Sequence, residues 1–304
     1  MDEMRNAAII GAGPAGIAAA IYLQRAGLAP LVLEKETLGG LLRNANLVEN
    51  YPGFAGGIRG EELVARFAEQ VGSLSIEVRK EAVKTVKLVG GAFRIETDAR
   101  ADSSRAVIVA SGTRPRIPEI PGIRHLSGKK VFFELAPMHF DENEYHHTIV
   151  LGGGDAAFDY ALNLTGRGHR VTILSRSKPR CLPLLRERAA EKGIVVKEGV
   201  MVEQLEETEK GVTARCRTGA RRERIYGDAV IVAHGRTPEL GMLDRSLLRR
   251  VRNPENPPET SVPGLYLVGD VVRGEHRQTG IAVGDGIMAA MLLERYVAGT
   301  RRRI

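Results

Sequence analysis

Ala7-Ala8-Ile9-Ile10-Gly11-Ala12-Gly13-Pro14-Ala15-Gly16 is the stretch that decides the fold. Apolar residues that fit a buried strand are followed at once by a GxGxxG pattern and then by an apolar helical run over 17–23. A strand that turns sharply on glycine into a helix brings backbone N–H groups and the positive helix end against a diphosphate. The stretch therefore predicts a dinucleotide-binding strand–helix unit.

A second pattern of the same kind occurs in Thr148-Ile149-Val150-Leu151-Gly152-Gly153-Gly154-Asp155-Ala156-Ala157. One glycine pattern is weak evidence, but two in the right context point to two dinucleotides held by one chain. We therefore predict an α/β fold with two Rossmann-like dinucleotide-binding domains. This is the arrangement expected of a protein that passes a hydride from one cofactor to another.

Length and composition limit the class of protein. A chain of 304 residues is long enough for two domains, each with its own core. Hydrophobic residues make up 43% and charged residues 27%, a globular balance. No apolar run approaches the roughly 20 residues that span a bilayer, so a membrane is not an expected partner. No signal peptide is recognised, and the cytoplasm is the expected location.

The net charge of +7 is unevenly distributed. Basic residues gather in 167–192, in 215–224 and at 301–303. Such fields raise the encounter rate with anionic partners, although a solvated basic surface is the other interpretation. There is no RNP motif, helix-turn-helix or Trp, so nucleic acid is not an expected partner. Acidic proteins and phosphorylated cofactors are better candidates.

Two Pro-containing segments mark the expected domain boundaries. Arg114-Pro115-Arg116-Ile117-Pro118 follows a strand that ends near Gly112, and Arg236-Thr237-Pro238 follows a strand that ends near Gly235. Stiff crossings of this kind fit the ends of an inserted domain. We therefore predict one domain over 1–115 and 240–304, and a second domain, inserted in the first, over 116–239.

Glu34 stands at the C-terminal end of the second predicted strand, 31–33. A carboxylate at this place can accept hydrogen bonds from both ribose hydroxyls of a bound adenosine. An exposed acid at a strand end, without a ligand, is the other interpretation.

Six motifs, in their order and spacing, resemble the low-molecular-weight thioredoxin reductases, a family of two-domain flavoproteins. They lie at 11–16, 49–54, 110–113, 152–157, 268–270 and 277–279. The resemblance implies the arrangement of the class II pyridine nucleotide-disulfide oxidoreductases, with the NAD(P) domain inserted in the FAD domain. It also implies FAD in the outer domain, NAD(P)H in the inserted one, and a homodimer.

The resemblance further implies site residues. The first glycine turn would hold the FAD diphosphate, Glu34 the adenosine ribose, and Asp270 the ribityl or phosphate side. The expected FAD-binding residues are Gly11, Gly13, Pro14, Ala15, Gly16, Glu34, Lys35, Gly40, Leu42, Asn50, Gly112, Gly269, Asp270, Gln278 and Thr279. The expected NAD(P)-binding residues are Gly152, Gly154, Asp155, Ala156, Arg176 and Arg180. No catalytic side chain is assigned, and the His- and Glu-rich stretch 138–147 is interpreted as a surface loop, not a metal site.

One departure from the family concerns thiols. Thioredoxin reductases carry a CxxC motif just upstream of the second glycine pattern, and this dithiol passes electrons from flavin to thioredoxin. Here the corresponding stretch, 129–138, has no cysteine, and the two cysteines are Cys181 and Cys216. A dithiol relay needs two thiols in contact, so the ordinary route to thioredoxin is excluded. Both cysteines are interpreted as small hydrophobes. The other interpretation is that basic neighbours lower the pKa of Cys181 and make it reactive.

A second departure concerns the nicotinamide nucleotide. The strand 171–174 is followed by Ser175-Arg176-Ser177-Lys178-Pro179-Arg180, where the related reductases have a His-Arg-Arg triplet. Arginine at this place accommodates the 2′-phosphate of NADP, whereas NAD sites have an acid. NADPH is therefore the expected nucleotide, with NADH or no nucleotide as alternatives.

These features predict an FAD-dependent oxidoreductase that takes a hydride from NADPH and passes electrons from the flavin directly to an acceptor. The expected acceptor is an acidic electron-transfer protein such as ferredoxin or flavodoxin, or a small molecule. A ferredoxin-reducing subgroup also lacks the CxxC, but it has a C-terminal extension that we do not expect here. Two alternatives stay open: a flavoprotein fed by reduced ferredoxin, and a flavin-binding regulatory protein with a vestigial nucleotide site.

Overall fold

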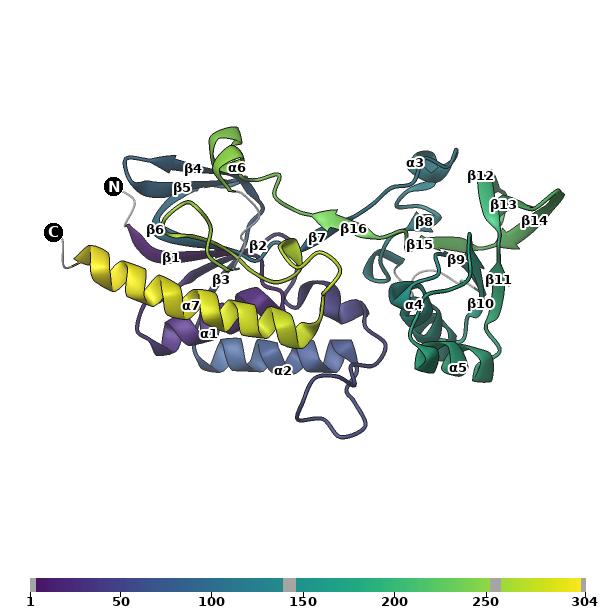
Figure 1. The fold of residues 1–304 in the computed structure, drawn as a ribbon, viewed down its shortest axis with the longest axis horizontal. Coiled ribbons are helices and arrows are strands. Elements are labelled where there is room, and N and C mark those ends of the chain that lie inside the picture. The colour runs from purple at the N-terminus through teal and green to yellow at the C-terminus, as the bar shows by residue number, and fades with distance from the viewer. Residues whose placement is uncertain (1–3, 139–145, 252–257, 302–304) are drawn as a thin grey trace. The chain divides into compact units, whose positions relative to one another are not determined.

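A computed structural model describes residues 4–138, 146–251 and 258–301 of the chain. The chain divides into two compact units (Figure 1). The first comprises Met1–Arg43, Glu49–Arg114 and Thr237–Ile304, and the second comprises Asn44–Val48 and Pro115–Arg236. Where the chain passes from one unit to the other, β7 (Thr113–Pro115) and β16 (Arg236–Pro238) pair as a two-stranded sheet.

A seven-stranded sheet forms the centre of the first unit, in the order β3-β2-β1-β6-β5-β4 with β17 beside β6. β1, β2, β3, β6 and β17 pair in parallel, and β4 and β5 are antiparallel additions. The strands are β1 (Arg5–Ile10), β2 (Leu31–Glu34), β3 (Glu77–Lys80), β4 (Val83–Val89), β5 (Ala92–Thr97), β6 (Ala101–Val109) and β17 (Leu265–Leu267). The helices are α1 (Pro14–Arg25), α2 (Gly60–Ser73), α6 (Arg245–Arg250) and α7 (Thr279–Arg301), with the short turns η1 (Gly40–Asn44) and η3 (Gly269–Val271).

The central strand β1 is buried on both faces of this sheet. Ile9 belongs to the hydrophobic core on one face and Ile10 to the core on the other. This is the burial expected of a parallel strand, and it explains the continuous apolar run in the sequence. Helices α1 and α7 lie side by side (Figure 1). Gly286 permits this approach, because a Cβ there would collide with the carbonyl oxygen of Ala15.

The second unit is built on a five-stranded parallel sheet in the order β11-β10-β9-β15-β8. An antiparallel sheet, β12-β13-β14, accompanies it. The strands are β8 (Val131–Phe132), β9 (His147–Leu151), β10 (Arg170–Ser175), β11 (Val195–Glu198), β12 (Met201–Thr208), β13 (Gly211–Thr218), β14 (Arg221–Gly227) and β15 (Ala229–Val232). The helices are α3 (Ile123–Leu126), α4 (Asp155–Gly166) and α5 (Pro183–Glu191), with the turn η2 (Ala136–Met138).

Both units therefore have a sheet whose central strands are parallel, with hydrophobic cores on its two faces. In each unit a central strand leads through glycine into a helix, β1 into α1 and β9 into α4. The predicted α/β class, with two Rossmann-like units, is confirmed. The limits of the two cofactor-binding domains, 1–115 with 240–304 and 116–239, stay a prediction from the sequence.

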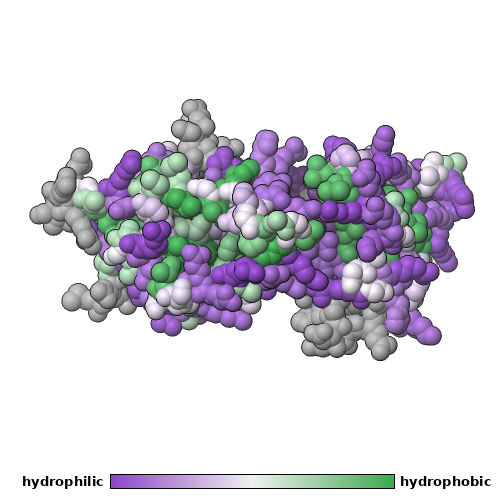
Figure 2. Space-filling model, turned by 90° about the horizontal axis from the view of Figure 1, so that it is seen from below, coloured by the Kyte–Doolittle hydropathy of each residue, from purple (hydrophilic) through white to green (hydrophobic). Residues whose placement is uncertain are grey.

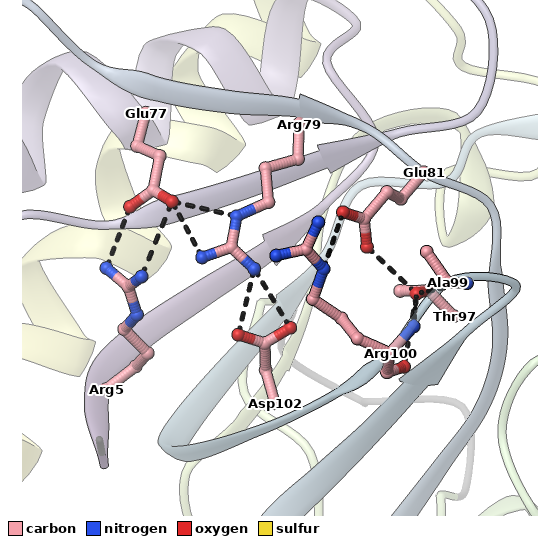
Figure 3. A network of polar contacts seen from close by, with 8 residues as sticks. All are labelled: Arg5, Glu77, Arg79, Glu81, Thr97, Ala99, Arg100 and Asp102. Atoms are coloured by element: carbon pink, nitrogen blue, oxygen red, sulfur yellow. Dashed lines mark hydrogen bonds and ion pairs between the residues drawn. The ribbon is translucent and has the colours of Figure 1, made fainter. Parts of the chain in front are cut away.

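A chain of charged side chains joins β3 to β1 and to β6 in the first unit (Figure 3). Arg5 on β1 donates to Glu77 on β3 at 2.8 Å. Arg79 also donates to Glu77, at 2.8 Å, and to both oxygens of Asp102 on β6, at 3.0 and 3.1 Å. The network in Figure 3 also contains Glu81, Thr97 and Arg100.

Arg79→Met is expected to lower the free energy of unfolding by about 2 kcal/mol, because it leaves the carboxylate of Asp102 mostly buried without its partner. The side chains of Arg79 and Asp102 are only 18% and 13% exposed. Arg94→Met is the matched control, because its side chain is 54% exposed and pairs with Glu96 at the surface. The control should change the free energy by about 0.5 kcal/mol or less. Urea unfolding measures both; equal effects would mean that the network does not stabilise the unit.

Hydrophilic residues cover most of the face in Figure 2, with smaller hydrophobic areas between them. Among the described residues, the structure has no helix of sufficient length and apolar character to cross a bilayer.

Candidate functional site

The turn between β1 and α1 depends on glycine for two different reasons. Gly11 has φ +102°, and a Cβ on it would collide with the carbonyl oxygen of Ala110. A Cβ on Gly16 would collide with the carbonyl oxygen of Gly11. Gly13 has an ordinary φ of −73°, and a Cβ on it would meet nothing within 4 Å. Gly11 and Gly16 are thus required by the protein's own packing, whereas Gly13 borders open space.

The start of α1 fits an anionic ligand. Pro14 is its first residue, and the first turn contains no acidic residue. The positive end of the helix dipole is therefore not opposed by a carboxylate of the first turn. Free backbone N–H groups at such an end bind phosphate. The open space at Gly13 lets a ligand backbone come close, so these residues fit the diphosphate of FAD.

Glu34, at the end of β2, closes the same turn. Its Oε2 accepts a hydrogen bond from the backbone N of Ala12 at 2.7 Å, and its Oε1 accepts one from Glu36 N at 2.8 Å. An ionised carboxylate has about four acceptor positions, so the side chain keeps capacity for ribose hydroxyls.

Two further short elements meet this turn. Gly39 N donates to the carbonyl oxygen of Ala12 at 2.8 Å, which fixes the start of η1. A Cβ on Gly40, in η1, would lie 3.4 Å from the Cα of Gly13. A Cβ on Gly269, in η3, would lie 3.0 Å from the Cβ of Ala15. Both η1 and η3 therefore lie close to the β1–α1 turn.

Asn50 and Gln278, both predicted near the flavin, are hydrogen-bonded to each other. Asn50 Nδ2 donates to Gln278 Oε1 at 2.8 Å. This bond joins the loop after η1 to the start of α7. Segments far apart in the sequence are thereby brought to one place.

Asp285 is a supporting residue that the sequence analysis missed. It is buried in α7 and accepts hydrogen bonds from Gly269 N at 3.1 Å and from Arg273 Nε at 2.8 Å. It therefore fixes η3, which carries Asp270. Nothing in the sequence marks this acid, because no spacing rule relates a residue within a helix to a turn that precedes it.

The predicted FAD-binding residues are distributed over these elements. They lie at the β1–α1 turn (Gly11, Gly13, Pro14, Ala15, Gly16), at the end of β2 and after it (Glu34, Lys35), in η1 (Gly40, Leu42), in the following loop (Asn50), after β6 (Gly112), in η3 (Gly269, Asp270), and at the start of α7 (Gln278, Thr279).

The turn between β9 and α4 repeats the arrangement in the second unit. Gly152 has φ +150°, and a Cβ on it would lie 2.6 Å from the carbonyl oxygen of Ala233. A Cβ on Gly153 would collide with the Ser175 hydroxyl. Gly154 has φ −100°, and a Cβ there would meet nothing within 4 Å. One glycine again borders open space directly before the helix; Gly152, Gly154, Asp155 and Ala156 all lie at this turn.

The segment 175–182, called the basic strap below, lies against this second turn. Arg180 N donates to the carbonyl oxygen of Gly153 at 2.7 Å. Arg176, Lys178 and Arg180 are exposed along the strap. Burial, and then the charge of Arg176, lower the pKa of His234 at the end of β15. The predicted 2′-phosphate ligands Arg176 and Arg180 thus follow β10 at the edge where a Rossmann sheet binds its nucleotide.

Asp159, on α4, has its pKa raised to about 6, and burial is the main cause. Both of its oxygens accept a hydrogen bond from Asn46 N, at 3.0 and 3.3 Å. This bond lowers the pKa, but it offsets only part of the rise that burial causes. Asn46 belongs to the short segment that groups with the second unit.

The raised pKa of Asp159 has a consequence for stability against pH. The carboxylate is destabilised in the folded state, so its penalty is absent below pH 4, grows as the pH rises toward about 6, and is fully present above that pH. Asp159→Asn should therefore raise the free energy of unfolding above pH 6 by about 1–3 kcal/mol, and by nothing below pH 4. Thermal melts from pH 4 to 8 measure this difference. Glu187→Gln, which removes an exposed acid from α5, is the control for the loss of a surface charge. For Asp159→Asn, a parallel shift at every pH would contradict the prediction.

The pKa of Cys181 is not lowered below its ordinary value by its basic neighbours, as the alternative interpretation of this thiol expected. Burial, followed by the charge of Asp155, raises the pKa of its thiol. Burial also raises the pKa of Cys216 to about 11. Both cysteines are free. The stretch 129–138 contains no cysteine, and its Leu135 and Met138 are buried in a core of the second unit.

No group of three or more potential metal-ligating His, Cys, Asp or Glu residues occurs in the part of the chain that the structure describes. Most of the His- and Glu-rich stretch 138–147, namely 139–145, lies outside the described residues.

Comparison with known proteins finds one matching family and several similar chains. The model of the pyridine nucleotide-disulphide oxidoreductase family matches residues 5–286. The chain is 34% identical to a thioredoxin reductase of Mycolicibacterium smegmatis, over 98% of both chains. It is 32% identical to a 34.2 kDa protein in the rubredoxin operon of Clostridium pasteurianum, over 98% of this chain and 99% of the other. The structure is similar to a thioredoxin reductase from Lactococcus lactis, with TM-score 0.88, 28% identity, and coverage of 98% and 100%.

Proposed function

We propose that this chain, which belongs to the pyridine nucleotide-disulphide oxidoreductase family, passes electrons from NADPH through FAD directly to an acceptor, without a dithiol relay. As a thioredoxin-reductase-like member of that family it is an FAD-dependent NAD(P)H oxidoreductase, and FAD and NADPH are its cofactors. The direct route, the binding residues and the acceptor are the parts that are proposed.

The observation that carries the proposal is the pair of strand–helix turns, each with one glycine that borders open space. We assign the first turn, with η1, η3 and the start of α7, to FAD, in a domain of 1–115 and 240–304. The second turn and the basic strap are assigned to NADPH, in a domain of 116–239. Bound FAD would supply the redox chemistry, and the chain's own residues bind and orient the two cofactors.

The direct route follows from the thiols. A relay needs two thiols in contact, one of them activated. The chain has two cysteines in all, they are not spaced as CxxC, and burial raises the pKa of each thiol. Electrons therefore leave from the flavin itself in this proposal.

An acidic electron-transfer protein is the proposed acceptor, and a homodimer the proposed assembly. On the antiparallel sheet of the second unit, Arg215 lies opposite Arg224, and Arg217 lies opposite Arg222. Carboxylates on β12 pair with part of this charge. Concentrated positive charge speeds the encounter with an anionic protein. The relative from the rubredoxin operon supports an electron carrier as the acceptor. Ferredoxin and flavodoxin are the first carriers to test.

The cytoplasmic location of the protein stays a prediction from the sequence.

An anaerobic titration tests the proposal. The purified protein is titrated with NADPH and then NADH, and the flavin absorbance is followed. Bleaching by NADPH, followed by recovery on addition of oxidised ferredoxin or flavodoxin, is the expected result. A flavin that neither nucleotide reduces would contradict the proposal and favour feeding by reduced ferredoxin or a structural flavin.

A further inference from the structure

An acidic residue stands where the proposed function places an anion. Asp155 is the first residue of α4 and is exposed. A carboxylate at a helix N-terminus is favourable for the helix, but it opposes the binding of a diphosphate at the same end. The first turn of α1 contains no such acid. The difference between the two turns indicates that Asp155 has a role other than contact with the nucleotide.

The carboxylate of Asp155 is engaged by the basic strap. Its Oδ1 accepts a hydrogen bond from Leu182 N at 2.8 Å. Leu182 directly precedes Pro183, where α5 begins. Together with the bond from Arg180 N to Gly153 O at 2.7 Å, this bond holds the C-terminal end of the strap against the start of α4.

The other end of the strap is also fixed. Ser175 is buried at the end of β10, and its hydroxyl donates to the carbonyl oxygen of Ser177 at 2.7 Å. Pro179 is buried, and its Cα would lie 3.5 Å from a Cβ on Gly153. A Cβ on Gly153 would also collide with the Ser175 hydroxyl, so glycine at 153 is what lets this end of the strap come close. Between these fixed points the strap carries its three exposed cations.

We propose that Asp155 is a positioning residue that sets the preference for NADPH over NADH, by holding the basic strap in the place where its cations meet the 2′-phosphate. The inference rests on the proposed function, which assigns this unit to NADPH. A strap fixed in advance loses less freedom on binding, and this raises its affinity for a phosphate. NADH has no 2′-phosphate, so it gains nothing from the strap.

The two effects of Asp155 can be separated. Its negative charge acts on the diphosphate, which NADPH and NADH share, so removal of the charge should change the affinity for both nucleotides alike. Its hydrogen bond acts on the strap. In this proposal the cations of the strap contact the 2′-phosphate, which NADH lacks. Asp155→Asn removes the charge and keeps an acceptor oxygen for Leu182 N, whereas Asp155→Ala removes both.

Isothermal titration calorimetry on the FAD-loaded protein makes the test, with NADP⁺ and NAD⁺ as ligands that do not reduce the flavin. The same titration with the fragments 2′,5′-ADP and 5′-AMP tests the adenosine end of the nucleotide alone. The measured quantity is the ratio of the affinities with and without the 2′-phosphate. Glu187→Ala, which removes an exposed acid from α5, is the control for long-range charge.

Asp155→Ala is expected to lower this ratio about fivefold, the size of one lost hydrogen bond, while Asp155→Asn and Glu187→Ala keep it within about twofold. Equal changes for both ligands in Asp155→Ala, or the same loss in Asp155→Asn, would overturn the inference. Wild-type protein that does not prefer NADP⁺ would instead contradict the assignment of the strap, and thus the nucleotide part of the proposed function. The wild-type ratio is therefore measured first.

Discussion

Gly13→Ala is expected to give a stably folded protein that has lost most of its affinity for FAD. Gly13 has an ordinary φ, and a Cβ there would meet no protein atom within 4 Å, so the fold tolerates the methyl group. That methyl group would occupy the space through which the diphosphate approaches the backbone. An overpacked contact costs about 2 kcal/mol, which corresponds to a loss of affinity of roughly 30-fold.

The measurement is FAD retention during purification, followed by reconstitution with FAD and titration by flavin fluorescence. Gly16→Ala is the contrasting variant, because its Cβ would collide with the backbone at Gly11. It should lower the stability of the protein itself. Gly72→Ala, in α2, is the matched control, because its Cβ meets nothing within 4 Å and it lies on no predicted site. If Gly13→Ala binds FAD like the Gly72 control, the first turn is not the FAD site.

Arg176→Ala is expected to weaken the binding of NADPH by roughly 30-fold and that of NADH by less than about threefold. A hydrogen bond between a guanidinium and a phosphate contributes about 1.5–3 kcal/mol, and only NADPH carries the 2′-phosphate. Stopped-flow flavin reduction at varied nucleotide concentration gives both apparent dissociation constants. Arg186→Ala is the matched control on α5, because this arginine is paired with Glu198 at 2.7 Å.

Equal losses for the two nucleotides in Arg176→Ala would show that the side chain contacts the shared diphosphate or ribose. The assignment of the strap to the 2′-phosphate would then be wrong. A loss of the same size in Arg186→Ala would show that the effect is a general one of positive charge.

Much of the fold could be predicted from local pattern. A buried apolar run that ends in GxGxxG contains in consecutive residues the strand, the turn and the helix, and both βα turns lie where these patterns place them. The same holds for the absence of CxxC, which is a property of the sequence alone. The alternative interpretation of Cys181, a thiol pKa lowered by basic neighbours, rested on charges counted along the chain; that count does not include burial, which raises its pKa.

The sequence by itself determined the two dinucleotide-binding turns, the acid after the second strand and the basic strap, because each is a matter of residue type at short spacing. The tertiary structure alone decided the partner of each side chain: Ala12 for Glu34, Leu182 for Asp155, and Gly269 for Asp285. A carboxylate can accept from any backbone N–H that the folded chain brings within about 3 Å, and residue type does not name that donor. The donor is set by the paths of the strands and helices, and only the packing of the hydrophobic cores fixes these paths.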